Sequence, residues 1–591
     1  MSAANARYRT GLDRPPPSEG RGLSVAVRHR VREYAVAVGA VLAAAAALAL
    51  DERLEWPWML LGWIALTPWL AVLDRTRSVR QALCSGMLMS LAFVLVTLNW
   101  FASSIQAYTG APRCVALLVM GLMAPILEPQ FITCALARHL ARRATGTDGF
   151  SAEIRTAFWR PAIVGACVYV GTESLWPKLF GDSLGYGLYP STWMRQAADL
   201  GGVYGLTFAL IIANECMLAI VCFLLASFVA RSTNSGRPPA RAAVAPGACV
   251  GASVLALLVY GAVRCAQYDA KAHSAETVSA ALIQANISQY DRMAAELGTF
   301  EAVRRILDTH FTLSNQALAR APLDFLVWPE TVYPTTFGSP KSEAGAAFDR
   351  EIAGFVSSTG VPLVFGAYDA EAGDEFNAAI SLQPGQDDGV TFDAYRKASL
   401  FPLTERVPAL LESARIRSWL PWLGTWRPGK GAAVLPLTLH DGRTIRIAPL
   451  ICYDALKPAL VRAAVRRGAQ IIVTLSNDFW FRYGPAPHAH LVLAAFRSIE
   501  SRRAQLRVTN TGISGVITAT GELLSTAGLH QRAILVGTVP LEGHASTLVL
   551  AWGEWFGPSA FTVGVALLAA QLFGGRKEPL RPVAADAGVA S

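Results

Sequence analysis

The chain alternates between long apolar runs and one long segment of mixed polarity. Runs of about 20 mainly apolar residues are long enough to cross a lipid bilayer as helices. Eight such runs occur, near residues 35–50, 57–73, 82–101, 113–138, 161–177, 203–229, 245–264 and 556–573. The pattern predicts a polytopic α-helical membrane bundle of about eight transmembrane helices, with a long insert before the last one.

The insert has a different periodicity from the apolar runs. Short runs rich in β-branched and aromatic residues alternate in it with amphipathic stretches. We expect strands at 278–287, 324–330, 361–369, 446–454 and 470–478, and helices at 301–321 and 456–469. Strand–helix alternation predicts an α/β layer architecture with buried strands, and roughly 280 residues are ample for one such core.

Basic residues gather in every second stretch that flanks the apolar runs. They occur in RHRVRE (28–33), DRTRSVR (74–80), ARHLARR (137–143), ARSTNSGRPPAR (230–241) and GGRKEPLR (574–581). Intervening stretches such as DERLEW (51–56) and FASSIQAYTGAP (101–112) carry almost no Lys or Arg. The positive-inside rule places the basic stretches in the cytoplasm. Eight crossings then put both termini inside and the insert outside.

These patterns divide the chain into five segments. We predict a disordered cytoplasmic N-terminus at 1–33, seven transmembrane helices at 34–269, an external α/β domain at 270–553, a C-terminal transmembrane helix at 554–575 and a cytoplasmic tail at 576–591.

Composition narrows the class of protein further. The 591 residues are 53% hydrophobic and 16% charged, with a net charge of +9. Because the basic groups lie next to apolar runs, the charge reflects membrane topology, and no nucleic-acid partner is predicted. Eight of nine cysteines lie in or beside apolar runs, and no CxxC pair exists. Cys452 alone lies in the insert, where it is either a buried filler or a reactive thiol.

Three predicted strand ends carry side chains that could perform chemistry. DFLVWPE ends in Glu330, DAYRKASLFPLTERVP (393–408) carries Lys397 and Glu405, and APLICYDALKP (448–458) carries Cys452. Each alone is ordinarily structural: a solvated carboxylate, a surface charge or a packed thiol. If they converge on one pocket, Glu330 can take the thiol proton and Lys397 can stabilise an oxyanion. The product would be a thioester acyl-enzyme, released to water or to an amine.

The order WPE, YRK, ICYD resembles the Glu–Lys–Cys signature of the nitrilase superfamily of carbon–nitrogen hydrolases, whose members have an αββα sandwich. Over a larger span, about residues 52 to 573, the chain resembles the apolipoprotein N-acyltransferases, in which such a domain is inserted late in a bundle of eight membrane helices. The matching stretches are LNWF (98–101), ADLGGVYGLTF (198–208), QANI (284–287), VWPETVYP (327–334), LSNDFWF (475–481), HLVLAAFRSIESRR (490–503) and LRVTNTGISGVI (506–517).

The resemblance implies a role for each matching residue. Glu330 is the base, Lys397 the oxyanion-stabilising cation and Cys452 the nucleophile. Glu405 matches a second active-site glutamate that orients Lys397 or assists proton transfer; a salt bridge to Arg406 or another cation is the alternative.

Two neighbours of the nucleophile also match positions that the family needs. They are Tyr453 and Asp454; strand packing and an N-cap of the next helix are the respective alternatives.

The chain departs from the family pattern at three places, which mark it as a somewhat divergent copy. Asp454 stands where the family usually has glutamate, and Thr404 where it has glycine. The tryptophan expected after QANI is absent from SQYDRMAAEL (288–297). These departures bear on acyl-donor choice and on lid motion.

Other candidate signals are weaker. His488 and His490 have no third ligand nearby in the sequence, so no metal site is predicted. Trp480 either lines the acyl pocket or packs in the core. SWLPWLGTW (418–426) is either an amphipathic arm in the outer leaflet, where tryptophans favour the interface, or a loop packed on the domain.

The resemblance implies an N-acyltransferase of the bacterial inner membrane with its catalytic domain in the periplasm. A fatty acyl chain would pass from a glycerophospholipid, through a thioester on Cys452, to the α-amino group of the N-terminal diacylglyceryl-cysteine of an apolipoprotein. No metal or organic cofactor is expected. A membrane-anchored amidase that uses water as acceptor and a non-catalytic lipoprotein-binding scaffold are the alternatives.

Overall fold

The computed structural model describes most of the chain. The described residues are 19–144, 158–233, 238–287, 290–386, 389–407, 413–419, 424–479, 481, 484–543 and 546–574. Most of the predicted N-terminal segment, residues 1–18, and the predicted tail at 576–591 therefore lie outside the described residues.

All eight apolar runs are helical. The helices of the membrane bundle are α1 (Glu19–Asp51), η1 (Trp58–Trp63), α2 (Thr67–Leu73), α3 (Val79–Val96), α4 (Asn99–Thr109), α5 (Arg113–Leu127), α6 (Pro129–Ala144), α7 (Trp159–Leu175), η3 (Leu184–Leu188), η4 (Met194–Ala197), α8 (Ala198–Ser232), α9 (Arg241–Ala272) and α17 (Phe556–Gly574).

Five helices of the described chain are long and apolar enough to span a membrane: Val27–Asp51 within α1, α3, Met194–Ser232, α9 and Phe556–Phe573 within α17. The helices α5 and α6 are bent by 45° and would together make a sixth span. The remaining two runs form shorter helices, at Trp58–Leu73 and in α7. The predicted membrane bundle is thus confirmed, with five or six spans of full length.

Two of the basic stretches belong to helices. Residues 28–33 lie within α1, which begins at Glu19 rather than at residue 34, and residues 137–143 lie within α6. Arg138 of this second stretch is buried and ion-paired with Asp74 and Glu215. Its positive charge is therefore neutralised inside the bundle.

The insert folds into two β-sheets. The first has the strand order β13-β1-β2-β4-β5-β6, with β3 paired to β4, and the second has the order β12-β11-β10-β9-β8-β7. The strands are β1 (Thr277–Gln284), β2 (Phe325–Val327), β3 (Tyr333–Thr336), β4 (Leu363–Glu371), β5 (Asp374–Pro384), β6 (Val390–Arg396), β7 (Leu435–Thr438), β8 (Thr444–Ile451), β9 (Ile471–Ser476), β10 (Gln505–Thr509), β11 (Ser514–Ile517), β12 (Leu523–Ala527) and β13 (Ala533–Pro540).

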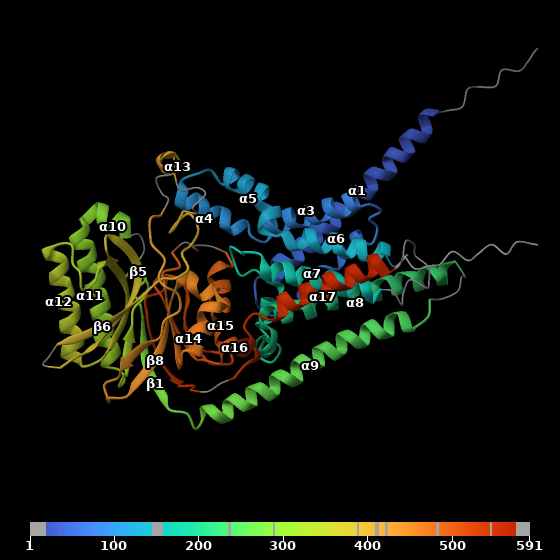
Figure 1. The fold of residues 1–591 in the computed structure, drawn as a ribbon. Helices are drawn as coiled ribbons and strands as arrows, with labels where there is room; N and C mark the ends of the chain where they lie inside the picture. The colour runs from blue at the N-terminus through green and yellow to red at the C-terminus, as the bar shows by residue number, and fades with distance from the viewer. Residues whose placement is uncertain are drawn as a thin grey trace, which may run out of the picture.

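The insert also contains helices, several of which cover the outer faces of the two sheets. They are α10 (Tyr290–Leu297), α11 (Thr299–Leu318), α12 (Glu343–Thr359), α13 (Ala414–Trp419), η6 (Cys452–Leu456), α14 (Pro458–Arg466), α15 (Ala486–Ser501) and α16 (Leu548–Trp552). Figure 1 shows α11 and α12 on the side away from the membrane bundle and α14 to α16 between the sheets and the bundle. The predicted αββα sandwich is confirmed.

The buried apolar residues follow these layers. Leu282, Phe325, Ile447 and Val473 belong to a core between the two sheets. In α15, Phe496 and neighbouring residues share one apolar core with the membrane helices. The sandwich is therefore packed onto the bundle, with α15 as the connecting layer.

Polar contacts also join the sandwich to the bundle. Arg502, at the end of α15, donates to Asp199 of α8 at 2.6 Å, and Tyr189 donates to the Gly521 carbonyl at 3.0 Å. Asp199 belongs to the ADLGGVYG stretch, so this motif has an interdomain role. In the first sheet β2 runs parallel to β1, and in the second sheet β8 runs parallel to β9. The carboxyl ends of such parallel strands are where catalytic groups are usually exposed.

Candidate active site

Glu330 follows β2, whose three residues are fully buried, and is itself 7% exposed. Its Oε1 accepts hydrogen bonds from Asn377 Nδ2 at 2.8 Å and from Lys397 Nζ at 3.2 Å. Its Oε2 accepts from the Asn477 backbone N–H at 3.1 Å. Three donors on one buried carboxylate fix its orientation.

Lys397 comes directly after β6. Its backbone N–H donates to the Asn377 carbonyl, and its carbonyl accepts from Gly429, both at 2.8 Å. The Nζ lies between two carboxylates, 3.2 Å from Glu330 and 2.6 Å from Glu405. Burial alone would lower the pKa of Lys397, but these two carboxylates outweigh it and hold the pKa well above its ordinary value. The ammonium is therefore charged.

Glu405 forms an ion pair with Lys397. Within the described residues it forms none with Arg406, the partner named in the alternative. Its second oxygen, Oε2, accepts from the Phe401 backbone N–H at 2.6 Å. Beside it, the Thr404 carbonyl accepts from Tyr108 of α4 at 3.3 Å. The loop that carries Glu405 therefore contacts the membrane bundle.

Cys452 lies at the end of β8, where its backbone has φ +47°. A left-handed conformation costs a residue with a side chain roughly 1–2 kcal/mol, so the surroundings must impose it. Burial raises the pKa of the Cys452 thiol, and Glu330 adds to this effect while Lys397 opposes it. The resting thiol is therefore protonated and needs a base before it can attack.

Tyr453 and Asp454 hold the turn that carries Cys452. The Tyr453 hydroxyl donates to the Leu179 carbonyl of the bundle at 2.8 Å. The Asp454 carboxylate accepts from the backbone N–H groups of Ser399 and Ile451, at 2.7 and 3.1 Å, and from the Tyr395 hydroxyl at 2.9 Å. Asp454 thus ties the β8 end to the segment after Lys397, and does not cap α14.

The four reactive groups line one cavity of about 1100 Å³. Glu330, Lys397, Glu405 and Cys452 line it together with residues of α4 and α5, among them Trp100, Phe101, Ile105, Val115, Ala116 and Val119. Val115 and Val119 are about half exposed. The cavity therefore extends from the thiol to helices of the membrane bundle.

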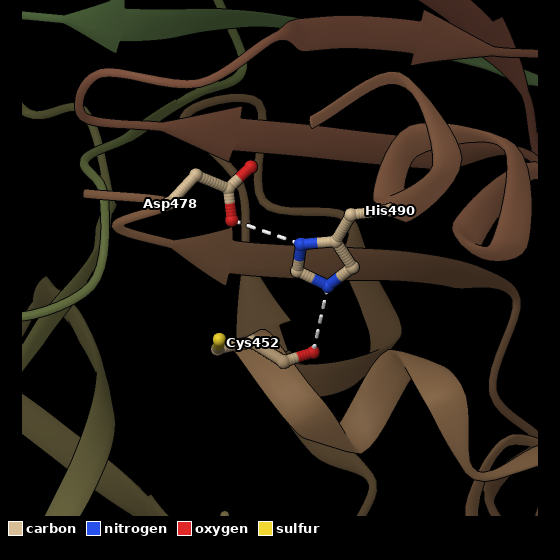
Figure 2. A group of neighbouring side chains, drawn as sticks. All are labelled: Cys452, Asp478 and His490. Carbon is tan, nitrogen blue, oxygen red and sulfur yellow. Dashed lines mark hydrogen bonds and ion pairs between the residues drawn. The ribbon is translucent and has the colours of Figure 1, made fainter. Parts of the chain in front are cut away.

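His490 contacts both Asp478 and Cys452. Its Nδ1 lies 2.9 Å from Asp478 Oδ1, and its Nε2 lies 3.4 Å from the Cys452 carbonyl oxygen (Figure 2). The ligand atoms of these three residues lie within 4.8 Å of one another, a spacing that a metal ion can use. The Arg507 guanidinium, 2.8 Å from Asp478 Oδ2, opposes a further cation there. His488 is separate, with its ring near the Arg53 carbonyl.

The tryptophan predictions have mixed outcomes. Trp480 lies outside the described residues, as do 420–423 of the Trp- and Pro-rich stretch. At the ends of that stretch, Trp419 is 68% exposed and borders the cavity, whereas Trp426 packs on Tyr368 with 4.6 Å between ring centres. Tyr290, an aromatic residue in the stretch where the expected tryptophan is missing, also lines the cavity.

Several residues of the site were not found by sequence reasoning. Asn377 orients Glu330, and Leu179 anchors Tyr453 through its backbone carbonyl. Gly366 allows its strand to pass the Glu330 backbone, because an added Cβ would lie 2.6 Å from Glu330 Cα. A backbone carbonyl leaves no signal in a sequence. Asp478 lies in the LSNDFWF stretch and Arg507 in LRVTNTGISGVI. The match of these two stretches to the family was the sequence signal that could have indicated the two residues.

Two family models match the chain. The apolipoprotein N-acyltransferase N-terminal domain matches residues 38–216, and the carbon-nitrogen hydrolase domain matches residues 279–547. The first lies in the membrane bundle and the second spans the sandwich. The resemblance predicted from the Glu–Lys–Cys order and the flanking motifs is therefore confirmed.

Curated relatives extend this similarity over most of the chain. The apolipoprotein N-acyltransferase of Geobacter metallireducens is 29% identical, covering 87% of this chain and 91% of the relative. That of Bdellovibrio bacteriovorus is 27% identical, covering 84% and 87%. Among solved structures, Saccharomyces cerevisiae Nit3, a member of branch 10 of the nitrilase superfamily, aligns with 18% identity and a TM-score of 0.33, covering 45% of this chain and 90% of that one.

Proposed function

Because the chain belongs to the apolipoprotein N-acyltransferase family, we propose that it acylates the α-amino group of the N-terminal diacylglyceryl-cysteine of apolipoproteins, with a glycerophospholipid as acyl donor. The observation that carries the proposal is the position of the Lys397 ammonium. It lies between Glu330 and Glu405 in a cavity that Cys452 and apolar residues of the membrane helices α4 and α5 also line.

The first half-reaction loads the thiol. Glu330 takes the proton of Cys452, and Sγ attacks the ester carbonyl of the phospholipid. An ammonium has three N–H donors, and within the described residues Lys397 Nζ donates to Glu330 and Glu405. The third N–H can stabilise the oxyanion. The intermediate then collapses, the lysophospholipid oxygen leaves with the proton from Glu330, and a thioester remains on Cys452.

The second half-reaction unloads it. The uncharged α-amine of the acceptor attacks the thioester carbonyl, and Glu330 takes a proton from the nitrogen. Collapse of this second intermediate breaks the C–S bond, and the departing sulfur recovers its proton from Glu330. The product is an amide, and the enzyme returns to its resting state. Because water competes with the amine, a site with an apolar wall favours transfer over hydrolysis.

The arrangement in Figure 1 supports a periplasmic site at the bacterial inner membrane. The start of α1, the end of α8, the start of α9 and the end of α17 lie at the end of the bundle away from the sandwich. These are the places where the sequence is basic, and basic ends favour the cytoplasmic side. The thiol is then on the outer side, where donor and acceptor are both anchored in the membrane.

Loading of Cys452 is the decisive test. The purified full chain, reconstituted in phospholipid nanodiscs, should carry a fatty-acyl adduct on Cys452 by peptide mass spectrometry, and hydroxylamine should remove it. Cys452→Ala should lose the adduct and should fail to restore lipoprotein acylation in cells depleted of the host enzyme. Cys84→Ala, at an exposed thiol outside the cavity, is the matched control and should behave as wild type.

Other outcomes select the alternatives. Release of ammonia or an amine from an amide substrate, with no fatty-acyl adduct formed from phospholipid, would identify a water-using amidase. Full complementation by Cys452→Ala would identify a non-catalytic scaffold.

A further inference from the structure

The proton on His490 Nε2 is fixed by its partner. His490 lies in the first turn of α15, is 6% exposed, and directs Nε2 at the Cys452 carbonyl (Figure 2). A carbonyl oxygen can only accept, so Nε2 must carry the hydrogen. Acceptance at Nδ1 from Arg507 Nη2, at 3.1 Å, leaves the single hydrogen of a neutral ring on Nε2. Donation from Nδ1 to Asp478 Oδ1, at 2.9 Å, is compatible with the Nε2–H only when both ring nitrogens carry a hydrogen.

Asp478 is itself tightly held. Its Oδ1 also accepts from Ser476 Oγ at 2.6 Å, and its Oδ2 accepts from Arg507 Nη2 at 2.8 Å. It is 3% exposed and has φ +55°. A Cβ at Gly512 would lie 2.3 Å from Asp478 Oδ2, so residue 512 must be glycine for this carboxylate to sit there. The TNTG stretch thus supports the partner of His490.

The group held at the end of this chain of contacts is the backbone of the nucleophile. Cys452 has a left-handed backbone, which a residue with a side chain adopts only when its surroundings impose it. Asp454 fixes the turn from the β6 side through Ser399 and Ile451. The His490 contact is the one that reaches the Cys452 carbonyl from α15.

We propose that His490 is a positioning residue for the nucleophile. Its Nε2–H holds the Cys452 carbonyl and thereby the direction of the thiol toward Glu330 and Lys397, while Asp478, Arg507 and Gly512 hold His490. The proposal deepens the proposed acyl transfer and rests on it for the rate effects. The direction of the thiol can be measured without any acyl transfer.

Amide variants separate positioning from packing. A glutamine amide nitrogen can reach the place of His490 Nε2, whereas the amide group of asparagine reaches only the place of Nδ1. His490→Gln should therefore keep thioester formation within about threefold of wild type. His490→Asn and His490→Ala should each lose about 100-fold in kcat, with KM for phospholipid unchanged, because a small displacement of a nucleophile costs about this much.

Alkylation gives a second readout that needs no substrate. The measured quantity is the rate at which N-ethylmaleimide labels Cys452 in the full chain, in detergent. Wild type and His490→Gln should have the same rate, and the rates of His490→Asn and His490→Ala should differ from it. Gly512→Ala, which displaces Asp478 from a distance, should resemble His490→Asn. His488→Asn, at a half-buried histidine of the same helix, is the matched control and should equal wild type.

The outcomes are distinct. Equal losses in His490→Gln and His490→Asn, or no change in any His490 variant or in Gly512→Ala, would overturn the proposal. If the wild type forms no thioester while Cys452 alkylation still depends on His490 in this order, the positioning role stands and the acyl-transfer proposal fails.

Discussion

Two buried cations in this protein each lie between two carboxylates, and they differ in what surrounds them. Lys397 in the sandwich contacts Glu330 and Glu405. Arg138 in the membrane bundle contacts Asp74 at 2.6 Å and Glu215 at 2.6 and 2.8 Å. Only the first cluster borders the cavity and the thiol.

The difference shows which features point to chemistry. Arg138 grips Glu215 through two parallel hydrogen bonds, a geometry suited to joining α6 to α8. The compact ammonium of Lys397 has three N–H donors, of which two are used within the described residues, and Lys397 lowers the pKa of the Cys452 thiol. A buried ion pair by itself therefore identifies no active site; a neighbouring nucleophile and a cavity do.

The comparison predicts its largest effect for Lys397→Met. Removing the oxyanion donor should lower the rate of thioester formation about 100- to 1000-fold, because the charge that develops on the carbonyl oxygen loses its stabilising partner. Single-turnover acylation in nanodiscs measures it. Lys341→Met, at an exposed lysine paired with Glu375, is the control and should keep the wild-type rate. A Lys397→Met rate near wild type would remove the distinction between the clusters.

The effect of Glu330→Gln on the alkylation of Cys452 is expected to be smaller, and its sign is opposite to the effect on acyl transfer. The Glu330 carboxylate raises the pKa of the Cys452 thiol, so its removal lowers that pKa and increases the thiolate fraction at a given pH. Alkylation of Cys452 at pH 8 should become about 10-fold faster, in line with a pKa lowered by about one unit, while acyl transfer is lost with the base.

The pH profile checks the cause. In wild type the alkylation rate should still be rising above pH 9, because burial raises the pKa of the thiol. The profile of Glu330→Gln should be shifted to lower pH. An unshifted profile would show that this carboxylate does not interact with the thiol.

The smallest effect on turnover is expected for Arg138→Met. Breaking the buried pair should destabilise the bundle by about 3–5 kcal/mol, because Asp74 and Glu215 lose their cation. The folded fraction should still turn over within about threefold of wild type. Thermal unfolding in detergent and activity per folded molecule measure the two quantities. A large loss of turnover at unchanged stability would give the bundle cluster a role in the reaction.

Much of the fold followed from local pattern. The apolar runs became helices, and the strands expected at 278–287, 446–454 and 470–478 became β1, β8 and β9 within a few residues. A helix or a strand buries residues at a fixed spacing along the chain, so the spacing of the apolar residues in the sequence predicts the element. The burial of the basic stretch 137–143 within α6 could not be predicted in this way, because Arg138 is neutralised by Asp74 and Glu215, which are distant in the chain.

The sequence by itself determined the membrane bundle and the α/β insert, and it indicated Glu330, Lys397 and Cys452 as candidates for the reaction, since these depend on hydrophobic period and on residue type and order. Only the tertiary structure decided that these three residues share a cavity with α4 and α5, that Asn377 holds Glu330, and that the Leu179 carbonyl holds Tyr453. The reason is geometric, because strand ends from two sheets meet only when the two sheets pack on each other. That packing depends on many weak contacts spread over the whole core.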